Sequence, residues 1–276
     1  MIGHHVLHVL QGAINNPALA ASYVTRRMKM PYWFRIFLGA VLPPYFNVST
    51  MRSLFVVTYG RSGSTLLTGY LSKLPGCDLK GENYLFPLPL ADADERLLAA
   101  TKLKYGNRHS PASPWYGSHE FSIWRWRRDV RRAILNQLYP TRPIPKTIGF
   151  KEIRWWYRMT EKDYEAKLDW IRSIRPPGAI VFLTRDLDKT MAGAWWAEMS
   201  PEDRDVARRG LERFEEWVRT YAAAHPDHSV HVTYEDFTAG PDAAQRICKL
   251  LGIRFDESRY REALGERYSY PSRKSD

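Results

Sequence analysis

The hydrophobic pattern of this chain consists of four short, continuous apolar runs separated by stretches with helical spacing. Runs of this kind are typical of strands that are buried on both faces of a parallel sheet. Helical stretches between such strands favour βαβ units and a doubly wound sheet. The pattern therefore predicts an α/β fold in which helices flank a parallel sheet within a single domain. The predicted strands are 54–58, 148–153, 179–184 and 230–234.

Two of the helical stretches carry clear start or stop signals. A helix is predicted to begin at Ser200, because a proline follows the serine and an acid stands three residues after it. This helix is expected to end near Ala224. A later helix is predicted over 241–251, with Gly252 as its stop. The buried face of the first helix is expected to comprise Val206, Leu211, Phe214, Val218 and Tyr221.

Seven prolines interrupt residues 86–147, which lie between the first two predicted strands. They predict short pieces, with room for a long helix only near 120–138. Within that helix, residues 124–128 place aromatic side chains beside arginines. Aromatic faces stack on sugar rings and arginines pair with anions, which favours an acceptor site. The alternative is an amphipathic helix with a solvated basic face.

The net charge of +11 over 276 residues is high for a globular protein. It indicates an acidic partner, which could be nucleic acid, an anionic membrane or a polyanionic small molecule. The length suits one domain with an ample core. Two cysteines provide neither a disulfide framework nor a metal cluster.

Residues 1–50 precede the first strand and are expected to form an extension to a domain that spans 51–276. No signal-peptide pattern is visible in 1–27, and no run reaches the roughly 18 apolar residues of a membrane span. We therefore expect a cytoplasmic protein. The segment 28–46 is apolar and flanked by basic residues, so two interpretations stay open. It packs on the core or borders an acceptor site, or it lies on a membrane surface and gives the protein a peripheral membrane contact.

A loop of small and polar residues follows the first predicted strand and precedes a helix. The N–H groups of such a loop and the positive end of its helix point at one spot, which favours a bound phosphate or sulfate. Gly60 and Gly63 permit unusual dihedral angles and a close approach of the backbone, and Arg61 adds a positive charge. The alternative is an ordinary turn that caps a helix. Hydroxyl donors are supplied by Ser62, Ser64 and Thr65.

Residues 58–65 resemble the 5′-phosphosulfate loop of sulfotransferases, which use 3′-phosphoadenosine 5′-phosphosulfate (PAPS) as donor. Many carbohydrate and bacterial members of that family carry Arg-Ser-Gly-Ser/Thr at this place. The resemblance implies a P-loop-type parallel sheet and sulfuryl transfer from PAPS to a hydroxyl of a carbohydrate or glycolipid-like acceptor. Four later segments are similar to family segments, in the family's order, at 81–83, 149–154, 181–186 and 234–237.

The resemblance also implies roles for individual residues at the donor site. Arg61 would stabilise the bridging oxygen and the leaving 5′-phosphate, Arg185 would contact the 3′-phosphate, and Tyr234 would contact the adenine. The family places a serine eight residues after the arginine that matches Arg185. Gly193 stands at that position here, and Thr190 is the expected substitute. The 5′-phosphate would be bound by Ser62, Gly63, Ser64 and Thr65.

The acceptor hydroxyl needs a general base. Glu82 is the expected base, because its place (82 − 61 = 21 positions after Arg61) is where several carbohydrate sulfotransferases carry a glutamate. The alternatives are His119 and Glu152, although Glu152 is better suited to pairing with an arginine. Lys151, at the end of the second strand, is expected to contact the sulfonate oxygens or the acceptor. The alternative is a salt bridge within the strand pair.

We expect no metal, because the sulfuryl group bears less charge than a terminal phosphate and no convincing metal-ligand spacing is present. Two other functions agree less well with the sequence. A small-molecule kinase with a P-loop would need Gly-Lys-Ser/Thr in the loop and an acid for magnesium at the end of the third strand, where Arg185 stands. A basic nucleic-acid-binding module would explain the net charge but not the ordered motifs. We therefore expect no nucleic-acid partner.

Overall fold

The computed structural model describes residues 52–102, 108–139, 145–158, 161–174 and 178–266. The predicted extension 1–50, with its segment 28–46, lies outside the described residues.

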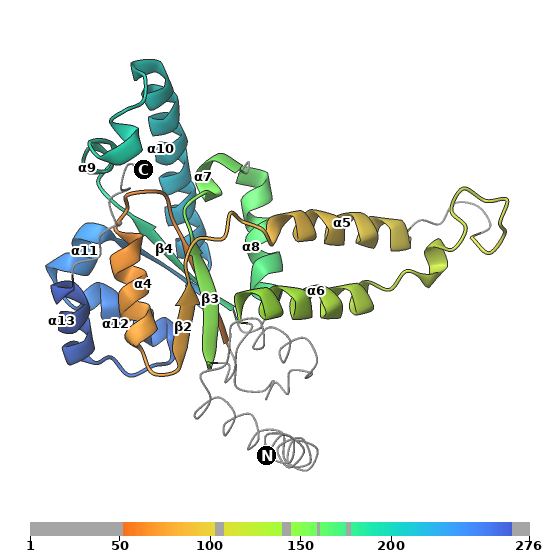
Figure 1. The fold of residues 1–276 in the computed structure, drawn as a ribbon, viewed down its shortest axis with the longest axis horizontal. Helices are drawn as coiled ribbons and strands as arrows, with labels where there is room; N and C mark the ends of the chain where they lie inside the picture. Colours follow the sequence, from red (N-terminus) through yellow and green to blue (C-terminus); the bar gives the residue numbers. More distant parts are fainter. Residues whose placement is uncertain (1–51, 103–107, 140–144, 159–160, 175–177, 267–276) are drawn as a thin grey trace, which may run out of the picture.

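A parallel sheet of five strands forms the centre of the molecule (Figure 1). All four predicted strands are confirmed to within two residues at each end, and the short edge strand β2 was not predicted. The α/β fold expected from the apolar runs is therefore present. In spatial order the strands are β2 (Cys77–Lys80), β3 (Thr147–Glu152), β1 (Arg52–Val57), β4 (Gly178–Thr184) and β5 (Ser229–Thr233).

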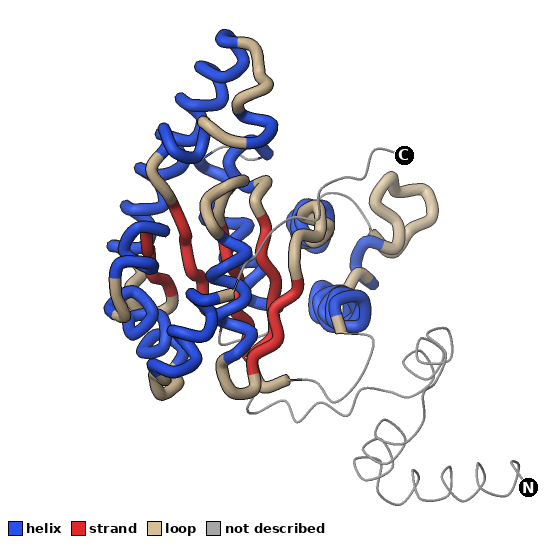
Figure 2. The backbone as a smooth tube through the Cα atoms, turned by 60° about the vertical axis from the view of Figure 1, so that its left-hand side comes forward, coloured by secondary structure: helices blue, strands red, loops and turns tan. Residues whose placement is uncertain are grey.

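Helices cover both faces of this sheet, as a doubly wound fold requires (Figure 2). Alternate residues of β1 point to opposite faces. Leu54 and Val56 pack against one set of helices, and Phe55 and Val57 pack against the other set. The first set is α4 (Ser64–Lys73), α11 (Tyr234–Ala239), α12 (Asp242–Leu251) and α13 (Glu257–Gly265). The second set is α5 (Leu88–Lys102), α6 (Ile123–Leu138), α8 (Glu161–Ile174) and α10 (Pro201–Ala224).

Helix α10 has the predicted bounds, and the Ser200 side chain accepts a hydrogen bond from the Asp203 N–H as its N-cap. Four of its five predicted core residues are buried, but Val206 is 62% exposed. Val206 lies five positions before Leu211, about 140° around the helix, so Ala207 takes the core position instead. Helix α12 also matches its prediction and ends at Gly252, whose φ of 60° is the left-handed conformation of a helix stop.

Helices α5 and α6 lie side by side and extend from the body as an arm (Figure 1). The sequence pattern does not predict helix α5, because Pro87 and Pro89 stand at its start. Pro89 occupies the first turn of α5, where no backbone donor is needed. The carboxylate of the buried Asp94 in α5 accepts hydrogen bonds from Nη2 and Nε of Arg127 in α6, at 2.7 and 3.0 Å. This ion pair joins the two helices.

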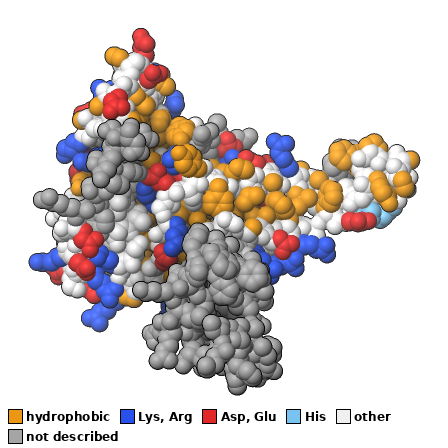
Figure 3. Space-filling view, in the orientation of Figure 1, with side chains coloured by type: hydrophobic (Ala, Val, Ile, Leu, Met, Phe, Trp, Pro, Cys, Tyr) orange, Lys and Arg blue, Asp and Glu red, His pale blue; other side chains and the backbone are white. Residues whose placement is uncertain are grey.

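Helix α6 is amphipathic: it buries Val130, Ile134 and Leu135 and exposes most of its arginines. Hydrophobic side chains gather along the arm in Figure 3. The exposed aromatics Trp115, Tyr116, Phe121 and Trp124 lie in or next to the connection between its two helices. The basic and aromatic stretch 124–128 therefore lies on the arm.

Shorter helices complete the structure: α7 (Trp155–Arg158), α9 (Leu187–Met191), η2 (Ser118–Glu120) and η3 (Ala194–Trp196). Within the described part of the chain, no helix combines the length and the apolar character needed to cross a membrane.

Candidate active site

The five strands of the sheet deliver the predicted site residues to its carboxyl edge, which is where ligands bind in open α/β sheets. The loop 58–63 follows β1, Glu82 follows β2, Lys151 lies near the end of β3, Arg185 follows β4 and Tyr234 follows β5. Residues that are far apart in sequence therefore meet at one edge.

The loop after β1 has the conformation of an anion cradle. Arg61 and Gly63 have positive φ values of 70° and 84°. Gly63 is the N-cap residue of α4, and no side chain caps this helix end, so the first N–H groups of the helix are open to a ligand. A Cβ on Gly63 would lie 2.1 Å from the Tyr234 ring, so only glycine fits between this ring and the helix.

The hydroxyl groups of the loop divide into buried and exposed ones. Ser62 is fully buried, and its hydroxyl lies 2.7 Å from that of Thr58, which in turn donates to the Leu183 carbonyl of β4 at 2.6 Å. The Ser62 side chain therefore fastens the loop to the sheet. Ser64 is also buried, whereas Arg61 and Thr65 are exposed at the mouth of the loop.

Arg185 and Tyr234, the residues predicted on the 3′-phosphate and the adenine, both lie against the loop. The Arg185 guanidinium donates to the Arg61 carbonyl at 3.1 Å and lies 4.5 Å from the centroid of the Tyr234 ring. Its Nε is buried without a hydrogen-bond partner among the described residues. The Thr190 hydroxyl likewise has no partner there, but Thr190 is fully buried within α9, so its contact with a donor stays a prediction.

Tyr59 ties the start of the loop to Arg185, a role that was not predicted. Its hydroxyl accepts a hydrogen bond from the Arg185 N–H at 2.7 Å and donates to the Glu215 carboxylate of α10. Burial raises the pKa of Glu215 above its ordinary value, and burial together with the charge of Glu215 raises that of Tyr59. The tyrosine thereby fixes the backbone that carries Arg185.

Glu82 and Lys151, both predicted as catalytic, form an ion pair. The Lys151 ammonium lies 2.6 Å from one Glu82 oxygen, and the Arg154 guanidinium lies 3.3 Å from the other. The Glu82 side chain is 18% exposed, so it is held firmly and still reaches solvent. The salt bridge considered for Lys151 is thus present, although its partner comes from the turn after β2 and not from a neighbouring strand.

Glu152, the alternative base, anchors the turn that carries Glu82. It is fully buried and accepts hydrogen bonds from the N–H groups of Asn83 and Leu85, both at 3.1 Å. It also pairs with Arg154 at 2.7 Å, which confirms the predicted pairing with an arginine. The other alternative, His119, lies in η2, where its ring contacts that of His109 in the connection of the arm.

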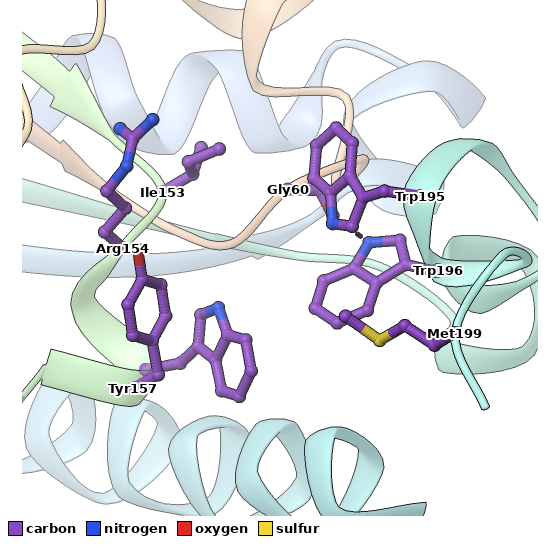
Figure 4. Close-up of a pocket in the computed structure, with 8 residues that line it drawn as sticks. Gly60, Ile153, Arg154, Tyr157, Trp195, Trp196 and Met199 are labelled. Carbon is purple, nitrogen blue, oxygen red and sulfur yellow. Dashed lines mark hydrogen bonds between the residues drawn. The ribbon is translucent and has the colours of Figure 1, made fainter. Parts of the chain in front are cut away.

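A cavity of about 390 Å³ opens beside the loop (Figure 4). Gly60 of the loop and Arg154 line part of it. We call it the aromatic cavity, because its other lining residues are Ile153, Trp156, Tyr157, Trp195, Trp196 and Met199.

The sequence pattern did not predict the aromatic cavity. A signal was present, since Trp156-Tyr157 and Trp195-Trp196 each follow a strand that carries a predicted site residue. The Trp196 indole donates to the Gly60 carbonyl at 3.2 Å, and a Cβ on Gly60 would lie 2.3 Å from the Trp195 ring. The two tryptophans therefore pack directly on the loop.

One group of described side chains has a metal-like arrangement: His225, Asp227 and His228. It lies between α10 and β5, at the sheet edge opposite the loop. Both ring nitrogens of His228 already have partners, Asp227 at 2.9 Å and the Tyr221 hydroxyl at 3.3 Å. The expectation that the donor site uses no metal stays a prediction.

Comparison with known proteins gives one family. The model of a family described as "Sulfotransferase family" matches residues 53–257, a range that contains every predicted site residue. No curated protein matches the chain. Among solved structures, the sulfotransferase domain of the olefin synthase from Synechococcus PCC 7002 is similar. It has 18% sequence identity and a TM-score of 0.49 over 79% of this chain and 78% of that one.

Proposed function

Because this chain belongs to the sulfotransferase family, we propose that it transfers a sulfuryl group from PAPS to a hydroxyl of a carbohydrate or glycolipid-like acceptor. The observation that carries the proposal is the meeting of Arg61, Arg185 and Tyr234 around the loop between β1 and α4. Three residues from three separate strand ends converge on a helix N-terminus that is suited to an anion.

The chemistry of these residues fits PAPS. The loop N–H groups and Arg61 would hold the 5′-phosphosulfate. Arg185 offers a buried guanidinium nitrogen that lacks a partner among the described residues, which suits a second phosphate. The Tyr234 ring, which already lies beneath a guanidinium, would provide a face for the adenine.

Arg61 would act on the leaving group. A guanidinium keeps its proton, so its contribution is electrostatic: it stabilises the negative charge that develops on the 5′-phosphate as the bond from sulfur to the bridging oxygen breaks. In-line transfer depends mostly on positioning, and the ties of Ser62 and Tyr59 to the neighbouring strand and helix keep the loop in place.

Glu82 would act on the acceptor. As the acceptor oxygen forms its bond to sulfur, the Glu82 carboxylate takes the hydroxyl proton. Lys151 and Arg154 hold this carboxylate from two sides, and Glu152 holds the turn beneath it. Lys151 also brings a positive charge to the sulfonate side of the site.

The proposal is tested by calorimetry with 3′-phosphoadenosine 5′-phosphate (PAP), in the presence of either EDTA or magnesium. We expect the same affinity in both, because arginine and backbone N–H groups provide the positive charge. Mass spectrometry of acceptor panels incubated with PAPS then detects the added sulfuryl group. Absence of PAP binding, or binding only with metal, would refute the donor assignment and favour a kinase.

A further inference from the structure

We propose that the acceptor is an amphiphilic alcohol, whose reacting hydroxyl adjoins an apolar ring or chain that lies in the aromatic cavity. The inference rests on the proposed sulfuryl transfer and favours the glycolipid-like half of the proposed acceptor class: the acceptor carries an apolar part, and a free sugar is disfavoured.

The position of the cavity assigns it to the acceptor. Gly60, at the start of the donor loop, lines one side. Arg154 lines another, and its guanidinium is bonded to Glu82. The cavity therefore adjoins the loop that would hold the sulfuryl donor and the arginine that holds the proposed base. Arg185 and Tyr234, which would hold the nucleotide, are not among its lining residues.

The walls of the cavity offer little to a polyhydroxylated ring. The Trp196 indole N–H already donates to Gly60. The Arg154 guanidinium is already engaged by Glu82 and Glu152 and stacks on the Tyr84 ring at 3.9 Å. Aromatic faces also stack on sugar rings, but the mostly apolar walls would leave several sugar hydroxyl groups without partners, which is costly, whereas an apolar body gains by leaving water.

The size and shape of the cavity indicate how much of the acceptor it holds. Its volume of about 390 Å³ lies near the lower end of the range for small-molecule sites, roughly 300–1,000 Å³. Tyr157 and Trp195 stand on opposite sides of it, and both are partly exposed, at 48% and 40% (Figure 4). One ring or a short length of chain fits between them, and the remainder of the acceptor projects into solvent.

The experiment compares acceptors that differ in their apolar part. PAP release is measured with methyl glucoside, with octyl glucoside below its micelle concentration, with 1-octanol and with 2-phenylethanol. We expect kcat/KM for the better of 1-octanol and 2-phenylethanol to exceed that for methyl glucoside at least tenfold. The comparison of 1-octanol with 2-phenylethanol decides between a chain and a ring. The inference is overturned if kcat/KM for methyl glucoside is higher than that for octyl glucoside, 1-octanol and 2-phenylethanol.

Variants of the cavity wall test whether the preference for apolar acceptors arises in the aromatic cavity. Trp195→Ala is expected to raise KM for the apolar alcohols about tenfold and to leave PAP affinity unchanged, while Trp195→Phe retains most of the activity. The matched control is Trp115→Ala, a tryptophan in the connection of the arm that is 42% exposed, and this variant should change neither KM nor PAP affinity. An equal loss with every acceptor in Trp195→Ala would mean that the tryptophan only supports the loop, and would overturn the assignment.

Direct binding separates the two proposals. Titration of the PAP complex with 2-phenylethanol and with 1-octanol, followed by tryptophan fluorescence, is expected to show saturable binding that Trp195→Ala weakens. If PAP binds and neither alcohol does, the acceptor inference fails and the proposed function stands. If PAP itself does not bind, the proposed function fails, and this inference fails with it.

Discussion

Arg61 has a backbone φ of 70°, in the left-handed region that residues other than glycine seldom occupy. Such a conformation costs on the order of 1 kcal/mol and persists where neighbouring contacts impose it. Here the Arg61 carbonyl accepts from Arg185, and the hydroxyl of the next residue, Ser62, lies against that of Thr58. The strain places a charged side chain at the mouth of the loop, where the leaving group is proposed to lie.

Replacement of Arg61 tests this electrostatic role. Arg61→Ala is expected to lower turnover about a hundredfold or more with the fold intact, because a charge partner of the transition state is lost. Arg61→Lys should keep much of the activity, since lysine also carries the charge. Turnover and circular dichroism of both variants check the prediction, and near-wild-type turnover of Arg61→Ala would exclude the role.

The two carboxylates near the proposed acceptor site should respond differently to the same chemical change. Glu82→Gln is expected to lower turnover about a hundredfold to ten-thousandfold without altering PAP affinity, because the base is lost. Glu152→Gln is expected to destabilise the fold by about 3 kcal/mol, because a buried charge that holds Arg154 and the Asn83–Leu85 turn is removed.

Denaturant unfolding and turnover are measured on both glutamine variants. If Glu152→Gln is stable but inactive and Glu82→Gln is active, Glu152 is the base and Glu82 has the structural role. His119→Ala serves as the control, because His119 lies on the arm and is expected to leave turnover unchanged.

At the scale of single elements, the strand–loop–helix unit at β1 and α4 was predictable because its signals are local. The apolar run and the two glycines stand next to each other in sequence. Strand β2 is only four residues long and has two polar positions, so no apolar run marks it. The ion pair between Glu82 and Lys151 joins residues 69 positions apart, and no pattern within one segment predicts such a contact.

The central strands also constrain one glycine that no pattern singled out. A Cβ on Gly149 of β3 would lie 1.7 Å from the Leu54 carbonyl oxygen of β1. Gly149→Ala is therefore expected to push the two strands apart and to destabilise the fold by about 3 kcal/mol or more. The control is Gly193→Ala, where the new Cβ meets nothing within 4 Å and the change should stay within about 0.5 kcal/mol. Urea unfolding measures the stability of both variants. If Gly149→Ala is as stable as Gly193→Ala, the predicted clash is contradicted.

At the scale of the whole molecule, the net charge of +11 is compatible both with a polyanionic donor and with nucleic acid. On the face seen in Figure 3, Lys and Arg side chains are interspersed with Asp and Glu and do not form one continuous stripe. A charge distribution of this kind favours a local anion site over a surface that follows a duplex.

Competition between ligands tests this distinction. We expect labelled duplex DNA to bind weakly and to lose affinity steeply with salt, because such binding rests on the release of counterions. Arg61→Ala should leave DNA binding unchanged, and saturating PAP should not displace the DNA. Displacement by PAP, or loss of DNA binding in the variant, would show that both ligands occupy the loop. Fluorescence anisotropy at two or more salt concentrations measures these effects.

The anchoring of Glu82 by a buried carboxylate makes the proposed base side of the site less tolerant of substitution than the far wall of the aromatic cavity. Glu152 binds its turn through backbone N–H groups and Arg154 at once, so a substitution there disturbs several contacts together. Trp195 and Met199 stand on a separate segment between α9 and α10. If the aromatic cavity holds the acceptor as proposed, substitutions at Trp195 and Met199 are expected to change the acceptor and to leave the turn that carries Glu82 in place.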